Sequence, residues 1–409
     1  MQKNIRKLFK IMKPKITIKK TNEKIKLLED KVFCLFERPL YKVLGTDPYL
    51  ILESKNNLKK TLDKYKINIK SKILKKYDFK PGACIVLGYD GSALLIFPSK
   101  YILEDAKTKQ RYEMKIDIRK RAEIKVDSKV KKFKAQKCTS NFTKTQYCKA
   151  VDRAIEYIKS GHIYQVNLAQ QFTGTTEKSF LELFKSFKKL SKTQYVSLIN
   201  MVNYQIISCT PERFLKRTNN TVITEPIKGT SPRAKDKRKD MDILKNLLYS
   251  EKEQKELAMI VDLARNDLNK TAIPGSVKVK EFKRVDVYPN VYHLAAKIEA
   301  EVNGSQHSLD IIDKAFPPAS VTGCPKSRAL EIIAELEKMK RGIYCGAIGW
   351  YGFDGDFDLS MAIRTIVTIP GANCTKYYYS AGSGIVFGSE PDKEYEETLH
   401  KASPFLGVI

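Results

Sequence analysis

The stretch CGAIGWYGFDGDFDLSMAIRTIVTI at residues 345–369 decides the fold class, because it has the pattern of successive strands. Apolar, aromatic and β-branched residues dominate it, and the glycines around Asp354 predict a tight turn between two strands. Similar strand patterns occur at 83–97, 163–175 and 195–209. The apolar spacing of amphipathic helices occurs at 145–161, 179–190, 240–268 and 327–340. Helices and strands do not alternate strictly, so we expect an α+β fold.

Composition bounds the class of protein. The chain has 409 residues, 42% of them hydrophobic, and a mean hydropathy of −0.37, which allows a sizeable core. No apolar run approaches the roughly 18 residues of a membrane span, and we expect no secretory signal. The eight cysteines are scattered without a CxxC pair. We therefore expect no structural zinc site and a reducing, cytoplasmic location.

The net charge of +29 is concentrated in the first third of the chain. Residues 1–150 carry 39 Lys and Arg against 15 Asp and Glu. A basic nucleic-acid-binding protein is therefore one hypothesis, although few aromatic residues are interleaved and a solvated lysine-rich surface explains the charge better. The basic stretch 128–142 is the best candidate for a linker. It divides a basic N-terminal region, 1–135, from a second region, 145–406.

Two pairs of glutamates have the spacing of a single helix face. Glu253 and Glu256 lie three residues apart in one helical pattern, and Glu394 and Glu397 do so in another. Brought together, the two faces would offer the oxygen ligands that Mg²⁺ prefers, although exposed helices show this spacing by chance. We expect Ser389 to cap the second helix.

Glycines and an arginine mark a second candidate region. Gly382 and Gly384 flank Ser383 in SAGSGIV, where the backbone could approach an anion closely or simply form a tight hairpin. Arg364 ends an apolar strand and needs a partner, which is either a structural glutamate or a substrate carboxylate.

Three further residues have possible roles in catalysis. Lys228 lies in the constrained turn TEPIKGT, where a pocket could make it a nucleophile, although a surface lysine is common in so basic a chain. Glu212 follows a strand and a proline and could act as a general acid nearby. His293 on its own is most often a packed core histidine. Spacing alone leaves these alternatives open.

Eight segments together resemble one family, the chorismate-utilising enzymes, and they occur in the family's order. They are GHIYQVNLAQQF, CTPERFL, PIKGTSPR, ELAMIVDLARNDL, VYHLAAKI, AFPPASVTGCPKSRALEIIAELE, YCGAIGWYGFDGDFDLSMAIRT and AGSGIVFGSEPDKEYEET, within residues 145–406. The resemblance implies a chorismate-binding fold of two packed antiparallel β-sheets flanked by helices, with the active site between them.

The resemblance also assigns roles to residues. It implies that Glu256 and Glu397 hold Mg²⁺, supported by Glu253 and Glu394 one turn earlier, and that the metal grips the ring carboxylate of chorismate. The resemblance further implies that Arg364 and Tyr344 bind the enolpyruvyl carboxylate, and that the backbone of Gly382, Ser383 and Gly384 binds the ring carboxylate. It also implies that His293 is an active-site residue. The residues implied to line the cavity are Thr230, Thr322 and Lys326. The segment ending at Ser54 resembles the part that holds tryptophan in anthranilate synthase.

Two positions indicate which member the chain resembles most. Gln165 replaces the lysine base of water-adding members, which disfavours isochorismate and salicylate synthases. Anthranilate synthase has PIAGT, whereas PIKGT, with Lys228, resembles aminodeoxychorismate synthase component I. That resemblance implies attack of Lys228 on C2 with Glu212 as acid, then attack of ammonia on C4. The product would be 4-amino-4-deoxychorismate, in p-aminobenzoate and folate synthesis.

The alternative member is anthranilate synthase component I, which serves tryptophan synthesis. Neither a Gly-x-Cys-x-Gly elbow nor a His-x-Glu pair of a glutaminase is visible in the sequence. We therefore expect ammonia to come from solution or from a separate glutamine amidotransferase subunit.

Overall fold

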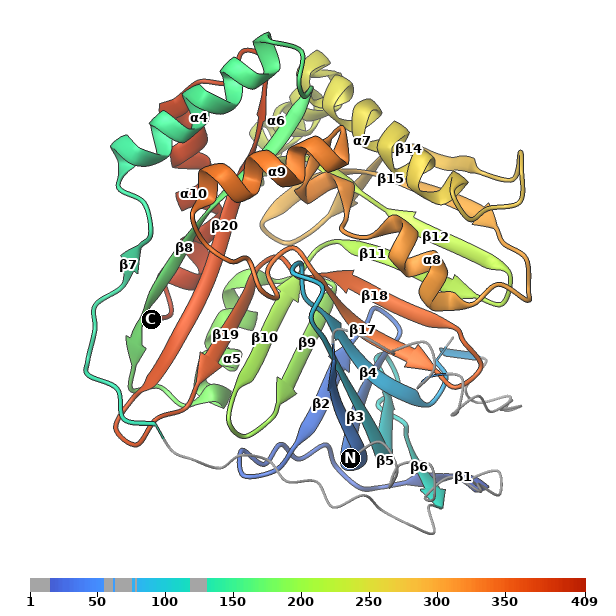
Figure 1. Ribbon diagram of the computed structural model, residues 1–409. Helices are drawn as coiled ribbons and strands as arrows, with labels where there is room; N and C mark the ends of the chain where they lie inside the picture. The colour runs from blue at the N-terminus through green and yellow to red at the C-terminus, as the bar shows by residue number, and fades with distance from the viewer. Residues whose placement is uncertain (1–14, 55–61, 63–75, 78, 118–130) are drawn as a thin grey trace.

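The computed structural model describes residues 15–54, 62, 76–77, 79–117 and 131–409 (Figure 1). The first part of the chain forms β1 (Lys15–Thr21), β2 (Phe33–Glu37), β3 (Tyr41–Ser54), β4 (Gly82–Leu87), β5 (Ala93–Asp105), β6 (Arg111–Asp117) and β7 (Thr139–Ser140). The middle forms α4 (Lys144–Lys159), β8 (Gln165–Thr176), α5 (Phe180–Ser191), β9 (Tyr195–Asn200), β10 (Gln205–Thr210), β11 (Arg213–Thr218), β12 (Thr221–Glu225), β13 (Ile227–Pro232), α6 (Lys237–Tyr249) and α7 (Glu251–Asn269). The last part forms β14 (Lys278–Val287), β15 (Val291–Glu301), α8 (Ser308–Ala315), the 3₁₀ turn η1 (Ala319–Val321), β16 (Gly323–Cys324), α9 (Lys326–Glu337), β17 (Ala347–Gly352), β18 (Phe357–Met361), β19 (Thr365–Ile369), β20 (Thr375–Val386) and α10 (Pro391–Leu406).

All the described strand pairs are antiparallel and join into one hydrogen-bonded network. The main path runs β8, β20, β19, β10, β9, β2, β3, β5, β4, β17, β18, β11, β12, β15 and β14. β13 also pairs with β15, and β16 with β8. The expected α+β fold, an antiparallel sheet structure with flanking helices, is confirmed.

The helices cover both ends of this path. α9 packs against β8 and α10 against β20, while α7 packs against β13 and β15 (Figure 1). The two ends come together in space, because the Lys228 side chain of β13 reaches Gly384 of β20. None of the described helices is long and apolar enough to cross a membrane.

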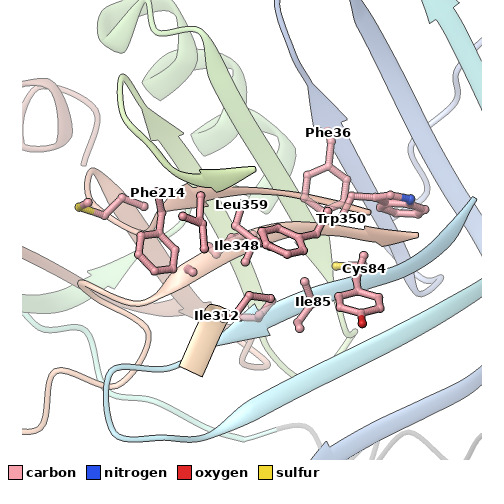
Figure 2. Close-up of a cluster of buried hydrophobic side chains, with 14 of the residues drawn as sticks. Phe36, Cys84, Ile85, Phe214, Ile312, Ile348, Trp350 and Leu359 are labelled. Atoms are coloured by element: carbon pink, nitrogen blue, oxygen red, sulfur yellow. The ribbon is translucent and has the colours of Figure 1, made fainter. Parts of the chain in front are cut away.

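The main core joins strands from both halves of the sequence. Phe36 of β2, Cys84 of β4 and Trp350 of β17 are buried together, and the Phe36 and Trp350 rings meet edge to face at 5.5 Å (Figure 2). β2 pairs with β9 and β4 with β17, so the N-terminal strands share the network of the later ones. In the predicted linker, residues 128–130 lie outside the described part. The division into 1–135 and 145–406 stays a prediction.

Three local expectations are wrong. The single helix expected over 240–268 is two helices, because Ser250 adopts an extended conformation that ends α6 and caps α7 by accepting a hydrogen bond from the Glu253 amide. Glu390, not Ser389, is the N-cap residue of α10. The Gly382–Gly384 segment is neither a loop nor a hairpin, since it pairs in register with β8 inside β20.

Candidate active site

Lys228 lies in β13, with its amine at the junction of three elements. Its Nζ is 3.6 Å from Oε2 of Glu256 on α7. A β-carbon at Gly384 of β20 would lie 3.1 Å from this Nζ and 3.1 Å from Nε2 of Gln165 on β8. Glycine at 384 therefore leaves the space that the lysine end occupies. The structure thus brings Lys228, Glu256 and Gly384 together.

The turn after Lys228 also requires glycine. Gly229 has a φ of +85°, in the left-handed region that favours glycine. A β-carbon there would lie 3.0 Å from Oε2 of Glu253, so a side chain would press on the carboxylates of α7. The PIKGT sequence therefore fits its location between β15 and α7.

Glu212 is a buried carboxyl group between β10 and β11. Burial raises its pKa to about 7, although a hydrogen bond from Ser320 and the nearby positive charges of Lys228 and Lys401 counteract the rise. Ser320 Oγ lies 3.1 Å from Glu212 Oε1. A carboxyl group with this pKa is partly protonated at neutral pH, which suits a general acid.

His293 on β15 is held as a neutral imidazole. Its pKa falls to about 4, because burial and the positive charge of Arg364 both disfavour the imidazolium. Its Nδ1 shares a 2.8 Å hydrogen bond with Thr230 Oγ1 of the neighbouring strand β13. At neutral pH His293 can therefore donate one hydrogen bond and accept another, but it does not carry a positive charge.

Arg364 lies between β18 and β19, with a left-handed φ of +48°. Among the ion pairs of the described residues, none involves its guanidinium. Of the two partners expected for Arg364, the structural glutamate is therefore not found in the described part. The charge of Arg364 lowers the pKa of His293, so the guanidinium lies near that histidine. It is a cationic group that could bind an anion there.

Carboxylates from α7 and α10 influence one another electrostatically. The pKa of Glu253 lies above its ordinary value, first because of burial and then because of the negative charges of Glu256 and Glu397. Burial also raises the pKa of Glu394, with the charge of Glu397 adding to the effect. The four glutamates predicted as metal ligands thus share one electrostatic environment.

Two further groups balance these carboxylates. Lys401 Nζ lies 2.6 Å from Oε1 of Glu397 and donates to the Gly382 carbonyl. Burial raises the pKa of Glu397, but the charge and hydrogen bond of Lys401, together with the charges of Lys228 and Lys252, keep it below its ordinary value. Ser389 Oγ donates to Glu394 Oε1 at 2.7 Å, while Glu394 Oε2 is buried without a hydrogen-bond partner in the described structure. Lys401 follows Glu397 by one helical turn, a spacing that could have identified it from the sequence.

Several other predicted residues have side-chain contacts of their own. The Ser383 hydroxyl lies 2.9 Å from the Tyr147 hydroxyl of α4, and the Ser383 side chain also favours the charged form of Glu394. Tyr344 is buried over the Arg341 guanidinium, 5.8 Å from the ring centre. Lys326 forms an ion pair of 2.7 Å with Asp267.

The last two predicted residues have other backbone or hydroxyl contacts. The Thr322 hydroxyl donates to the Pro318 carbonyl at 2.9 Å. The backbone of Ser54 pairs with Ala93 at the end of β3. The roles implied for these residues stay predictions. Ser320, which contacts Glu212, was not identified from the sequence because no local pattern links residues 108 positions apart.

Comparisons with known proteins identify the family of the chain. Residues 79–407 match the chorismate binding enzyme family. The chain belongs to this family. Over 267 residues it is 40% identical to aminodeoxychorismate synthase component 1 of Escherichia coli (strain K12), covering 65% of this chain and 58% of that protein. Over 290 residues it is 37% identical to anthranilate synthase component 1 of Acetivibrio thermocellus, covering 71% of this chain and 58% of that protein.

The aligned part thus spans 58% of the length of both relatives. Solved structures extend the likeness of fold to nearly the whole chain. The anthranilate synthase component I of Streptococcus pneumoniae TIGR4 matches with a TM-score of 0.76 and 23% identity over 94% of each chain. The menaquinone-specific isochorismate synthase of Escherichia coli matches with a TM-score of 0.78 and 17% identity, over 99% of this chain and 98% of its own.

Proposed function

We propose that this chain aminates chorismate at C4 to give 4-amino-4-deoxychorismate, as aminodeoxychorismate synthase component I. The observation that carries the proposal is the location of the Lys228 amine, beside Glu256 and Gly384 and within the electrostatic reach of the buried acid Glu212. A lysine in this turn can serve as a covalent nucleophile, which an alanine cannot.

The proposed first step uses Lys228 as the nucleophile and Glu212 as the acid. The neutral amine of Lys228 attacks C2, both ring double bonds shift, from C1=C2 to C1=C6 and from C5=C6 to C4=C5, and the C4–oxygen bond breaks. Glu212 donates its proton to the departing hydroxyl, which leaves as water. This step is supported by the pKa of about 7 for Glu212, because a carboxyl group with an ordinary pKa would already be ionised.

The second step replaces the lysine with ammonia. Ammonia attacks C4, both ring double bonds shift back, and the C2–nitrogen bond to Lys228 breaks, which restores the free amine. The carboxylate of Glu212 then takes one proton from the new C4 ammonium group. The net reaction consumes chorismate and ammonia, yields the amino product and water, and returns both side chains to their starting states.

We also propose that Mg²⁺ is the cofactor. Glu253 and Glu394, whose pKa values are raised by burial and by the charges of neighbouring carboxylates, form an environment that a divalent cation would stabilise, and Glu394 Oε2 has no hydrogen-bond partner among the described residues. Glu256 and Glu397 would hold the ion, with Glu253 and Glu394 beside them. No three acidic, His or Cys side chains of the described residues already form a closed cage. The bound ion would neutralise the ring carboxylate of chorismate.

The remaining parts of the proposal concern binding and supply. Arg364 would bind the enolpyruvyl carboxylate, with neutral His293 and Thr230 beside it. A separate glutamine amidotransferase subunit would deliver ammonia. All eight cysteines are free thiols, which supports a reducing compartment such as the cytoplasm.

Product analysis tests this function. The chain is incubated with chorismate, Mg²⁺ and ammonium, with and without an aminodeoxychorismate lyase, and the products are separated. We expect 4-amino-4-deoxychorismate alone and p-aminobenzoate with the lyase. Anthranilate without the lyase would instead establish the anthranilate synthase alternative. The Lys228→Ala variant should lose most C4 amination.

A further inference from the structure

Tyr288 lies in the turn between β14 and β15, next to the candidate site. Its backbone amide donates to the Val291 carbonyl, and its own carbonyl accepts from Arg233. The residue is 7% exposed. Its hydroxyl is buried and has no hydrogen-bond partner among the described residues. A buried hydroxyl without a partner is costly, so a ligand that accepts from it would be favoured.

The Tyr288 ring is fixed against the site. It meets the His293 ring edge to face, with the ring centres 5.3 Å apart and the planes at 73°. The hydroxyl is also near enough to Arg364 for the guanidinium charge to act on it. Tyr288, His293 and Arg364 therefore form one cluster on the β15 side of the site.

The acidic groups near Tyr288 are already engaged by arginines. Arg284 donates to both carboxylate oxygens of Asp286, at 2.7 and 3.0 Å. Glu225 receives hydrogen bonds from Arg213 and Arg284. The structure therefore gives no hydrogen bond from Tyr288 to either carboxylate.

The chemistry of the cluster selects an anion. Arg364 is a permanent cation without an ion-pair partner among the described residues, and it has five N–H donors and no acceptor. Burial keeps the pKa of Tyr288 above its ordinary value, so its hydroxyl stays protonated and can donate. A guanidinium and a phenol that both donate are matched by the two oxygens of a carboxylate.

We propose that the Tyr288 hydroxyl donates a hydrogen bond to the substrate carboxylate that Arg364 binds, which makes Tyr288 a further substrate-binding residue. The proposal rests on the function proposed above. Arg364 supplies a positive charge. Tyr288 lies between β14 and β15 and supplies an uncharged hydroxyl donor. The two together would favour substrates that retain the enolpyruvyl carboxylate.

Direct binding of chorismate tests the role of Tyr288. Tyr288→Phe removes only the hydroxyl, and calorimetry in the presence of Mg²⁺ measures the Kd without requiring turnover. We expect about a tenfold rise in the Kd and KM of chorismate, since a hydrogen bond to a carboxylate is lost, with kcat changed less than about threefold. The matched control is Tyr112→Phe, a half-buried tyrosine of β6 that packs on Tyr77, and it should bind like the wild type.

The same substitution made in the Arg364→Ala variant distinguishes a binding role of Tyr288 from a packing role. In Arg364→Ala the carboxylate is no longer anchored, so adding Tyr288→Phe should raise the Kd by less than about threefold. An unchanged Kd in Tyr288→Phe, or an equal loss in both backgrounds, would overturn the proposal. If the wild-type chain itself fails to bind chorismate, the proposed function fails, and the role of Tyr288 fails with it.

Discussion

The hydroxyl of Ser320 should set the pH range over which Glu212 can act as an acid. Ser320 Oγ lies 3.1 Å from Glu212 Oε1 and stabilises the charged carboxylate against the cost of burial. Ser320→Ala removes this donor and leaves the carboxyl group buried. The variant should therefore raise the pKa of Glu212 further above its present value of about 7.

The size of the shift follows from the strength of one hydrogen bond. A contribution of about 1 kcal/mol corresponds to roughly 0.7 pKa unit. At pH 8 a group with a pKa of about 7 is roughly 9% protonated, and one shifted by roughly 0.7 unit is about a third protonated. Relative to its own rate at low pH, the variant should therefore keep about three to four times more activity at pH 8.

The assay measures ammonium-dependent turnover of chorismate from pH 6 to 9. Because the free ammonia concentration rises with pH in every sample, the ratio of variant to wild-type rate is plotted, which cancels that effect. The ratio should rise as the wild-type acid is lost. Ser305→Ala, an exposed serine that hydrogen-bonds only within its own turn, serves as the control. A ratio that stays flat across this range would refute Glu212 as the acid.

Two further predictions concern the metal and the nitrogen source. Glu397→Gln removes a negative ligand while keeping its shape, so turnover should fall at least a hundredfold and the Mg²⁺ concentration for half-maximal activity should rise. The control variant Glu396→Gln, at an exposed neighbouring residue, should behave like the wild type. Wild-type Mg²⁺ dependence in Glu397→Gln would contradict the ligand assignment. The chain alone should be inactive with glutamine but active with ammonium at raised pH, and the host's amidotransferase should restore the use of glutamine. Glutamine-dependent turnover by the isolated chain would disprove the need for a partner.

The sequence predicted the parts of the fold that depend on local pattern. The tight turn expected around Asp354 is confirmed by the pairing of Tyr351 in β17 with Phe357 in β18, because glycines flank the turn and apolar residues dominate the strands on both sides. The break at Ser250 was missed, since the apolar spacing continues through both helices. A serine in an extended conformation ends one helix and caps the next without interrupting that pattern.

Each candidate site residue was named from the short motif that contains it, whereas contacts between residues far apart in the sequence could not be predicted. Lys228 and Glu256 were named from separate motifs, and their side chains meet in the structure. The glycines of 382–384 indicated a turn, but they lie in a strand. In this strand Gly384 leaves space for the end of the Lys228 side chain, which comes from another strand. The pairing of Lys326 with Asp267 joins residues 59 positions apart, and no local pattern predicts it.

The proposed reaction depends on a covalent bond between Lys228 and the substrate. The chain is mixed with chorismate and Mg²⁺ without ammonia, quenched in acid, and measured by intact mass and peptide mapping. We predict a species heavier by one chorismate less one water, located at Lys228 and absent from Lys228→Ala. Full production of 4-amino-4-deoxychorismate by Lys228→Ala, or an adduct on a different residue, would contradict it.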